Sequence, residues 1–280
     1  MSSDAPSAGP TVAQVFDALA ETYDQTGVAF FGPVGERLVS LLEPAPGESA
    51  LDIGCGRGAV TLPLAAAVGP SGHVDAVDVS PAMVAATRAS VEERRLDQVT
   101  VEVADAADLS GVLGNWPRYD VLASSLVLFF LEQPGEVLRR WVSLVAPGGR
   151  VGLSTFGDLD EPSEALDAGF APWLPPGMLD TRTSGTEGPF ASDEAMEELV
   201  RAAGLSAVRT VVEPRVLEFP DVDAWQRFSM STGQRAMWMR VPEEERPGLL
   251  ERAEEVLEGT REDGGPCRLV WQIRYTLARR

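Results

Sequence analysis

The chain contains no lysine: all 23 basic residues among its 280 are arginine, against 43 acidic residues. Schiff-base chemistry on a lysine, a P-loop lysine over nucleotide phosphates and a lysine base are therefore excluded. His73 is the single histidine, and the only thiols, Cys55 and Cys267, lie far apart in the chain. This excludes a paired-histidine zinc helix and a cysteine–histidine cluster, so we expect no metal site.

Positive charge is scarce as well, because the formal net charge is −20. Such a field repels nucleic acid and anionic membranes, and no local cluster of arginines offsets it. No apolar run approaches the ~18 residues of a membrane span, and the first ten residues lack the features of a signal peptide. We expect a cytoplasmic protein, monomeric or homodimeric, whose partner is a small molecule rather than nucleic acid or a membrane.

Short apolar strands alternate with helices through the first half of the chain. Strands are predicted at 49–53, 74–79, 99–103, 121–124 and 150–154, with helices between most of them. This alternation is typical of an α/β fold with a Rossmann-like, doubly wound and mostly parallel sheet. Two further strands, at 208–217 and 267–277, are expected to pair antiparallel, which gives seven strands with an antiparallel last strand.

The predicted domain organisation has three parts. Residues 1–10 are small and polar and are expected to be disordered, and an amphipathic helix near 12–23 forms an N-terminal helical cap. Residues 11–156 then form the cofactor-binding core together with this cap. Residues 157–280 contribute an inserted lid, from 157–191 and the helical stretch 221–260, and the last helix and strands of the same domain.

The strongest local signal is a glycine-rich turn, Asp52-Ile-Gly54-Cys-Gly56-Arg-Gly58, between a strand and a helix. Such a turn brings backbone amides at a helix N-terminus close to a ligand. With Ala59 the turn also matches the G-x-G-x-x-A fingerprint, so an NAD-dependent oxidoreductase is an alternative. A carboxylate at Asp52 would repel a bound diphosphate and attract an ammonium, which favours an amino-acid-bearing cofactor.

Two further acids follow strands of the same sheet. Asp78 ends the second strand, where an acidic side chain accepts the ribose hydroxyls of a nucleoside, and Asp105 follows the third strand, where it could accept the amine of adenine. The carboxyl ends of parallel strands meet at one edge of a sheet. We therefore expect these acids and the glycine turn to converge on one pocket.

Five motifs together resemble those of class I S-adenosylmethionine-dependent methyltransferases, and are most similar to the small-molecule branch that includes ubiquinone and menaquinone C-methyltransferases. They are Asp52-x-Gly-x-Gly-x-Gly58, Val77-Asp-Val-Ser-Pro-Ala-Met83, Ala104-Asp-Ala106, Asp120-Val-Leu-Ala-Ser-Ser125 and Leu144-Val-Ala-Pro-Gly-Gly149. The resemblance covers residues 11–156 and implies S-adenosylmethionine as the cofactor.

Carried over residue by residue, the resemblance implies that Gly54 and Gly56 back the methionine part and that Asp78 binds the ribose. It further implies that Met83 packs on the adenine and that Tyr23 closes over the cofactor. The complete cofactor-binding set expected from residues and resemblance is Tyr23, Asp52, Gly54, Cys55, Gly56, Asp78, Val79, Met83, Asp105, Ala106 and Ser125.

The chain departs from the family at Phe129 and Phe130, where many members carry histidine beside the substrate. Its only histidine, His73, precedes the second strand and is expected at the opposite edge of the sheet. No catalytic residue can be named, so methyl transfer would depend on positioning rather than on a histidine base.

The aromatic residues of the second half favour a largely apolar acceptor, as in specialised-metabolite biosynthesis. The expected substrate-lining residues are Phe129, Phe156, Phe170, Trp173, Trp225 and Phe228. The same fold and cofactor could also serve a cyclisation or rearrangement without methyl transfer.

Overall fold

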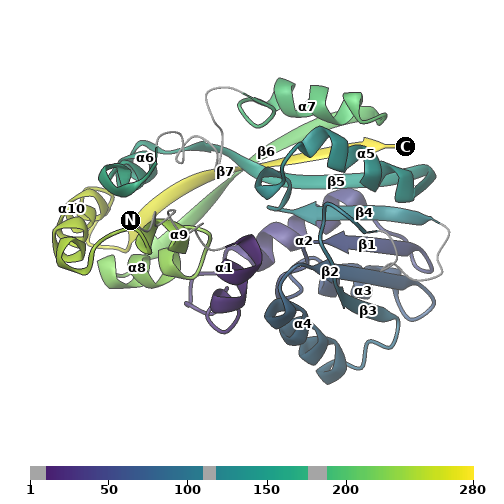
Figure 1. Cartoon of the computed structure of the whole chain (residues 1–280), viewed down its shortest axis with the longest axis horizontal. Coiled ribbons are helices and arrows are strands. Elements are labelled where there is room, and N and C mark those ends of the chain that lie inside the picture. The colour runs from purple at the N-terminus through teal and green to yellow at the C-terminus, as the bar shows by residue number, and fades with distance from the viewer. Residues whose placement is uncertain (1–10, 110–117, 176–187) are drawn as a thin grey trace, which may run out of the picture.

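A seven-stranded sheet organises the computed structural model, which describes residues 11–109, 118–175 and 188–280. The strand order is β3-β2-β1-β4-β5-β7-β6, parallel except that β7 runs antiparallel to both of its neighbours (Figure 1). This confirms the predicted α/β fold and its antiparallel last strand. The strands are β1 Ser49–Ile53, β2 His73–Asp78, β3 Val99–Val103, β4 Tyr119–Ser125, β5 Val145–Leu159, β6 Ser206–Phe219 and β7 Cys267–Arg279.

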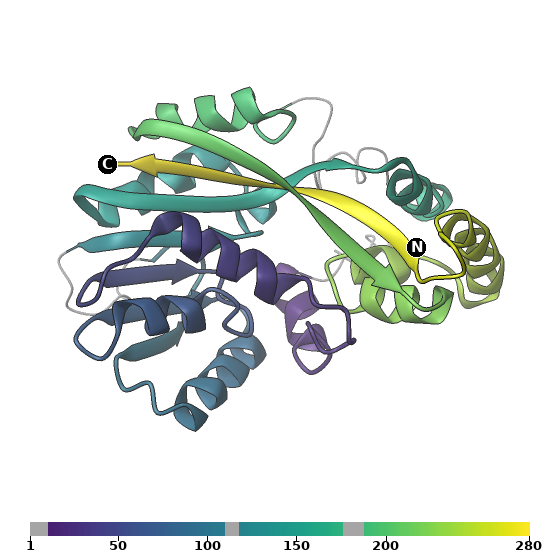
Figure 2. The same cartoon turned by 180° about the vertical axis from the view of Figure 1, so that it is seen from behind.

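Helices cover both faces of the sheet. The side chains of α2 and α3 share one core with the long ends of β6 and β7, and those of α5 and α7 form the core on the other face (Figures 1 and 2). Residues 1–10, predicted to be disordered, lie outside the described residues. The helices are α1 Val12–Leu19, α2 Phe31–Leu42, α3 Thr61–Val68, α4 Pro81–Glu93, α5 Pro134–Leu144, α6 Glu161–Ala168, α7 Asp193–Ala202, α8 Val222–Met230, α9 Arg235–Trp238 and α10 Arg246–Glu258.

The inner strand β1 is buried along its whole length, as expected for a strand covered on both faces, and its two polar residues, Ser49 and Asp52, are buried with it. The start of α4 is defined by an N-cap hydrogen bond and a proline. Ser80 Oγ accepts a hydrogen bond from the backbone N–H of Met83 at 3.1 Å, and Pro81 occupies the first helical position. Because only two residues separate this helix from β2, its N-terminus lies at the edge where the glycine turn follows β1.

The strands β5, β6 and β7 continue beyond the core, and α6, α8, α9 and α10 pack around their far ends; we call these four helices the helical lobe (Figure 1). Residues 157–159, predicted as lid, belong to β5, because the strand extends along β7 as far as the pair Leu159 and Trp271. The stretch 221–260 is divided into separate helices, since Gly233 and Pro242 interrupt it. Within the described ranges no helix is long and apolar enough to cross a membrane.

The close packing of α2 against the glycine turn predicts a cost for adding one methyl group. A Cβ at Gly35 would lie 2.3 Å from the backbone oxygen of Ala59, directly after the turn. Gly35→Ala is therefore expected to lower the free energy of unfolding by about 1–3 kcal/mol, although alanine is the better helix former. Urea unfolding followed by tryptophan fluorescence measures this loss.

The matched control is Gly32→Ala in the first turn of the same helix, where a Cβ would meet only Asp24 Oδ2 at 3.8 Å. This variant should be as stable as the wild type or slightly more stable. Equal stability of the two variants would show that α2 can move away from the turn without cost.

Candidate active site

The glycine turn follows β1 at the carboxyl edge of the sheet. Gly54 and Gly56 have φ angles of +79° and +52°, in the region that favours glycine. The backbone N–H groups of Gly54 and Cys55 both donate to the carbonyl oxygen of Val77, at 2.8 and 2.9 Å. The turn is thereby tied to β2 before the chain enters α3, as the predicted strand, turn and helix require.

Asp78 joins the turn to the next helix. One carboxylate oxygen accepts a hydrogen bond from the N–H of Gly56 at 2.8 Å, and the other accepts one from the N–H of Ser80 at 2.9 Å. Burial raises the pKa of Asp78, and these two backbone hydrogen bonds oppose that shift. The carboxylate therefore has a fixed orientation at the end of β2.

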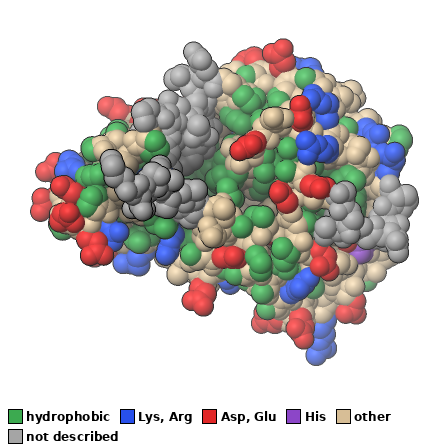
Figure 3. All heavy atoms as spheres, viewed as in Figure 1, with side chains coloured by type: hydrophobic (Ala, Val, Ile, Leu, Met, Phe, Trp, Pro, Cys, Tyr) green, Lys and Arg blue, Asp and Glu red, His purple; other side chains and the backbone are tan. Residues whose placement is uncertain are grey.

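A cavity of about 420 Å³ lies in front of this turn, next to a more open hollow of about 540 Å³. We call the first of these the large cavity. In the part of the chain that the structure describes, its lining carries three carboxylates, Asp78, Asp105 and Glu132, and no arginine or histidine. Figure 3 shows apolar side chains gathered in the hollow at the centre of this face, with acidic side chains beside it. A diphosphate would find no cationic partner among these described lining residues, whereas a cationic adenosyl ligand is electrostatically favoured.

The structure brings most of the predicted cofactor residues to this cavity. Asp105 is held locally, because its carboxylate accepts a hydrogen bond from the N–H of Ala107 at 2.8 Å. Glu132 was not predicted, since it follows a one-turn helix that no sequence pattern marks. The predicted residues that line the cavity are Tyr23, Gly54, Gly56, Asp78, Val79, Met83, Asp105, Ala106 and Ser125.

Asp52 and Cys55 do not line the large cavity, which corrects the expected contact of Asp52 with an ammonium group. Asp52 is completely buried beneath the turn, where it accepts a hydrogen bond from Thr61 Oγ1 at 2.6 Å. Burial raises the pKa of Asp52 to about 7. Cys55 packs behind the turn against Ala76 and lines a separate hollow. Both side chains are buried on the side of the turn that faces the core, so they pack against the turn and do not face the large cavity.

The N-terminal cap covers the large cavity. Asp17 of α1 accepts hydrogen bonds from Ser80 Oγ at 2.5 Å and from the N–H of Ala82 at 3.2 Å, which fixes α1 on the start of α4. Tyr23 stacks on Phe31, with ring centroids 4.2 Å apart. Burial raises the pKa of Tyr23 well above its usual value, so its hydroxyl stays protonated at neutral pH.

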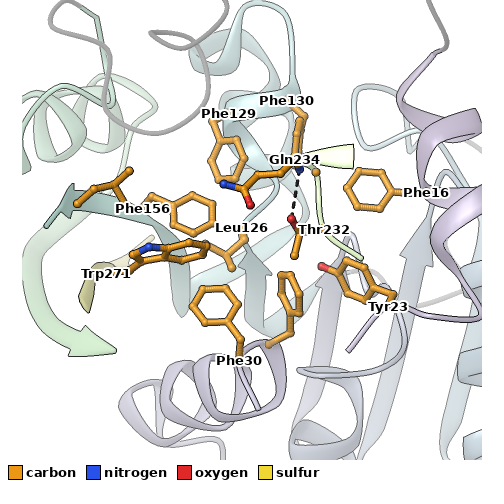
Figure 4. Close-up of a pocket in the computed structure, with 13 residues that line it drawn as sticks. Phe16, Tyr23, Phe30, Leu126, Phe129, Phe130, Phe156, Thr232, Gln234 and Trp271 are labelled. Atoms are coloured by element: carbon orange, nitrogen blue, oxygen red, sulfur yellow. Dashed lines mark hydrogen bonds between the residues drawn. The ribbon is translucent and has the colours of Figure 1, made fainter. Parts of the chain in front are cut away.

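A second, narrower space adjoins the large cavity; we call it the aromatic pocket (Figure 4). The two share Phe16, Tyr23, Leu126 and Phe130. Leu126 has a φ of +59°, a strained value for leucine of the kind that gathers at functional sites. The pocket is lined by Phe16, Tyr23, Phe30, Phe31, Leu126, Phe129, Phe130, Phe156, Leu159, Thr232, Gly233, Gln234 and Trp271.

Of the predicted substrate-lining residues, Phe129 and Phe156 lie in this pocket. The expectation is wrong for Phe170, Trp225 and Phe228, which are buried because the helical lobe needs a core of its own. Trp173 packs against the same core and does not line the aromatic pocket either.

Sequence reasoning missed several lining residues of the aromatic pocket. Trp271 lies on β7 and reaches the pocket because it pairs with Leu159 of β5. Thr232 and Gln234 come from the break between α8 and α9. Sequence spacing cannot place either group, because their positions depend on how the long strands and the lobe pack together.

His73 begins β2, at the amino edge of the sheet as predicted. Its Nε2 lies 2.8 Å from Asp75 Oδ1, and it lines neither the large cavity nor the aromatic pocket. The site thus combines an acidic nucleoside-type cavity with an apolar pocket at the carboxyl edge of a Rossmann-like sheet. This arrangement defines an enzyme that holds an adenosyl cofactor beside a small molecule.

Comparison with known proteins agrees with this definition. Residues 51–151 match a family model described as a methyltransferase domain. The chain is 35% identical to nocamycin O-methyltransferase of Saccharothrix syringae over 95% of this chain and 97% of that protein. It is 38% identical to the aklanonic acid methyltransferase of Streptomyces sp. strain C5 over 59% of this chain and 70% of that one.

Among solved structures, the YcgJ protein of a Bacillus shares the fold, with a TM-score of 0.60 and 14% identity over 89% of this chain and 98% of the other. The chain belongs to the S-adenosylmethionine-dependent methyltransferases, with natural-product O-methyltransferases among its relatives. Its cofactor is S-adenosylmethionine and its substrates are small molecules, so the NAD-dependent alternative is wrong.

The position of Asp78 predicts a loss of cofactor affinity. Asp78→Asn removes a charge that faces the cavity and leaves one of the Gly56 and Ser80 N–H groups without its acceptor, so S-adenosylmethionine should bind at least about tenfold more weakly. Calorimetric titration measures the affinity. Asp97→Asn, at an exposed position, should bind as the wild type does, and unchanged affinity in Asp78→Asn would contradict the assignment.

The raised pKa of Asp52 predicts a pH dependence of stability. Because its pKa is about 7 in the folded chain and near 4 when unfolded, the unfolded state releases its proton first as the pH rises. Relative to Asp52→Asn, the wild type should therefore lose about 1.4 kcal/mol of unfolding free energy per pH unit between pH 4 and pH 7.

Urea unfolding of both proteins without cofactor, at intervals across this pH range, measures the difference. A constant difference across the range would mean that Asp52 is ionised in the folded chain throughout.

Proposed function

We propose that this methyltransferase modifies an oxygen that is already ionised, a carboxylate or an acidic enol, on an apolar aromatic small molecule. The observation that carries the proposal is the composition of the aromatic pocket. Among the described residues, Tyr23 is the only ionisable side chain that lines it, and its raised pKa keeps it protonated. The described lining therefore supplies no base to remove a proton from a neutral hydroxyl.

In this reaction the residues of the chain position the cofactor and the acceptor molecule relative to each other. When bound, S-adenosylmethionine supplies an electrophilic methyl group on a positively charged sulfur. Asp78, Asp105 and Met83 hold the nucleoside end, while Phe16 and Tyr23 cover both spaces and exclude water. Aromatic faces at the junction of the two spaces favour a cation there.

The named activities of the relatives support oxygen as the acceptor atom and specialised metabolites as the acceptor class. One is named for O-methylation of nocamycin and the other for aklanonic acid. The sequence leaves the acceptor atom open, and the resemblance to ubiquinone and menaquinone C-methyltransferases keeps carbon as an alternative. The position of the new methyl group separates the two.

The experiment incubates the protein with S-adenosylmethionine and either aklanonic acid or 2-naphthoic acid. We expect S-adenosylhomocysteine and a methyl ester in equal amounts, both measured by mass spectrometry. Methylation at carbon would contradict the oxygen proposal. A rearranged product without S-adenosylhomocysteine would instead favour the cyclisation alternative.

Because Tyr23 stays protonated, we expect its ring to be needed for a high rate of methyl transfer and its hydroxyl to be dispensable. Tyr23→Phe should retain kcat within about threefold, with an unchanged pH profile, because no proton transfer is lost. Tyr23→Ala should lose at least about tenfold, because the cover over both spaces is opened. Steady-state rates across pH 6 to pH 9 measure both effects. A large loss in Tyr23→Phe, with an altered pH profile, would make the hydroxyl a base.

A further inference from the structure

One polar side chain stands out among the rings of the aromatic pocket. Gln234 is 6% exposed and lies in the break between α8 and α9. Its backbone is held in place, because its N–H donates to Thr232 Oγ1 at 3.2 Å, the dashed line in Figure 4. The adjacent Gly233 lies against Phe130, since a Cβ there would be 3.6 Å from Phe130 Cζ. The carboxamide of Gln234 therefore lines the pocket from a backbone segment, 232–234, whose position is fixed by these contacts.

The orientation of this carboxamide is also fixed. Its Nε2 donates to Asp167 Oδ1 of α6 at 2.8 Å. Because the nitrogen is the donor of this hydrogen bond, it faces Asp167 and the carboxamide oxygen faces the other way. The side-chain oxygen of Gln234 is buried and has no hydrogen-bond partner among the described residues.

A buried carbonyl oxygen without a donor is unfavourable, and in a native structure it commonly marks a place where another group binds. The hydroxyl of Thr232 does not compete for it, because this hydroxyl donates to the carbonyl oxygen of Ser229 at 3.0 Å. Apart from Gly233 and the hydroxyl of Tyr23, the rest of the described lining consists of aromatic rings and aliphatic side chains. The pocket therefore presents an acceptor of fixed direction in apolar surroundings.

We infer that the side-chain oxygen of Gln234 is a specificity-determining contact, which accepts a hydrogen bond from a hydroxyl group on the ring system of the acceptor molecule. Asp167 acts as a positioning residue that keeps the oxygen turned into the pocket. The inference rests on the proposed function, in that the aromatic pocket is taken to hold the acceptor. It adds that the acceptor carries a hydroxyl besides the oxygen that is methylated.

The test compares phenol with toluene, which differ only in a hydroxyl in place of a methyl group. Their dissociation constants are measured by NMR titration with the cofactor site saturated by S-adenosylhomocysteine. The wild type should bind phenol more tightly than toluene, and Gln234→Leu should bind toluene more tightly. The phenol preference should fall by about tenfold or more, because leucine offers the hydroxyl no acceptor.

Gln226→Leu is the matched control, since it makes the same change at a half-buried position of α8 that lines neither space. It should keep the wild-type preference. Asp167→Asn tests the positioning role without removing Gln234. Asparagine can donate as well as accept, so the carboxamide of Gln234 is free to turn over. This variant should bind phenol less tightly and anisole, which only accepts, more tightly than the wild type does.

Equal preference in wild type and Gln234→Leu, or a wild type that binds neither phenol nor toluene, would overturn the inference. Should Gln234→Leu fail to fold, the wild-type preference and the exchange between phenol and anisole in Asp167→Asn still decide it. The two proposals can fail independently. If the wild type prefers phenol but esterifies neither acid, Gln234 keeps its proposed role and the proposed acceptor class is rejected. If it esterifies an acid but shows no preference for phenol, the acceptor class stands and the role of Gln234 is rejected.

Discussion

The carboxylate of Asp78 joins three parts of the chain that are separate in sequence. It ends β2, accepts a hydrogen bond from Gly56 in the turn after β1, and accepts another from Ser80 at the start of α4. The cap depends on the same point, because Asp17 binds Ser80 and Ala82 beside it. An acid at this position therefore lines the cavity and also forms the connection that gives the cavity its shape.

The aromatic pocket depends on a different constraint, the length of three strands. Because β7 lies between β5 and β6 and all three extend beyond the core, the helical lobe can pack around their ends. The same extension sets Trp271 beside Phe156, with ring centroids 5.8 Å apart. The pocket is thus formed between the Rossmann-like core and the lobe, and it opens toward the cavity through Tyr23 and Phe16.

The large cavity and the aromatic pocket differ in the charged side chains that line them. The acids that line the large cavity suit a cationic adenosyl ligand, while the described residues of the aromatic pocket include no carboxylate and one ionisable group, Tyr23. An acceptor that arrives already ionised would then be attracted to the cationic cofactor and not to the pocket wall. The absence of lysine and the remote position of His73 agree with chemistry that relies on placement.

The sequence by itself determined the strand and helix alternation, the glycine turn and the acids at the strand ends, because each follows from local pattern and from the geometry of parallel sheets. It also placed His73 at the far edge. Only the tertiary structure decided that Asp52 points into the core, that Phe170, Trp225 and Phe228 form the core of the lobe, and that Gln234 faces the pocket. These outcomes depend on contacts between residues far apart in the chain, such as Gln234 with Asp167 and Trp271 with Phe156, which no local spacing encodes.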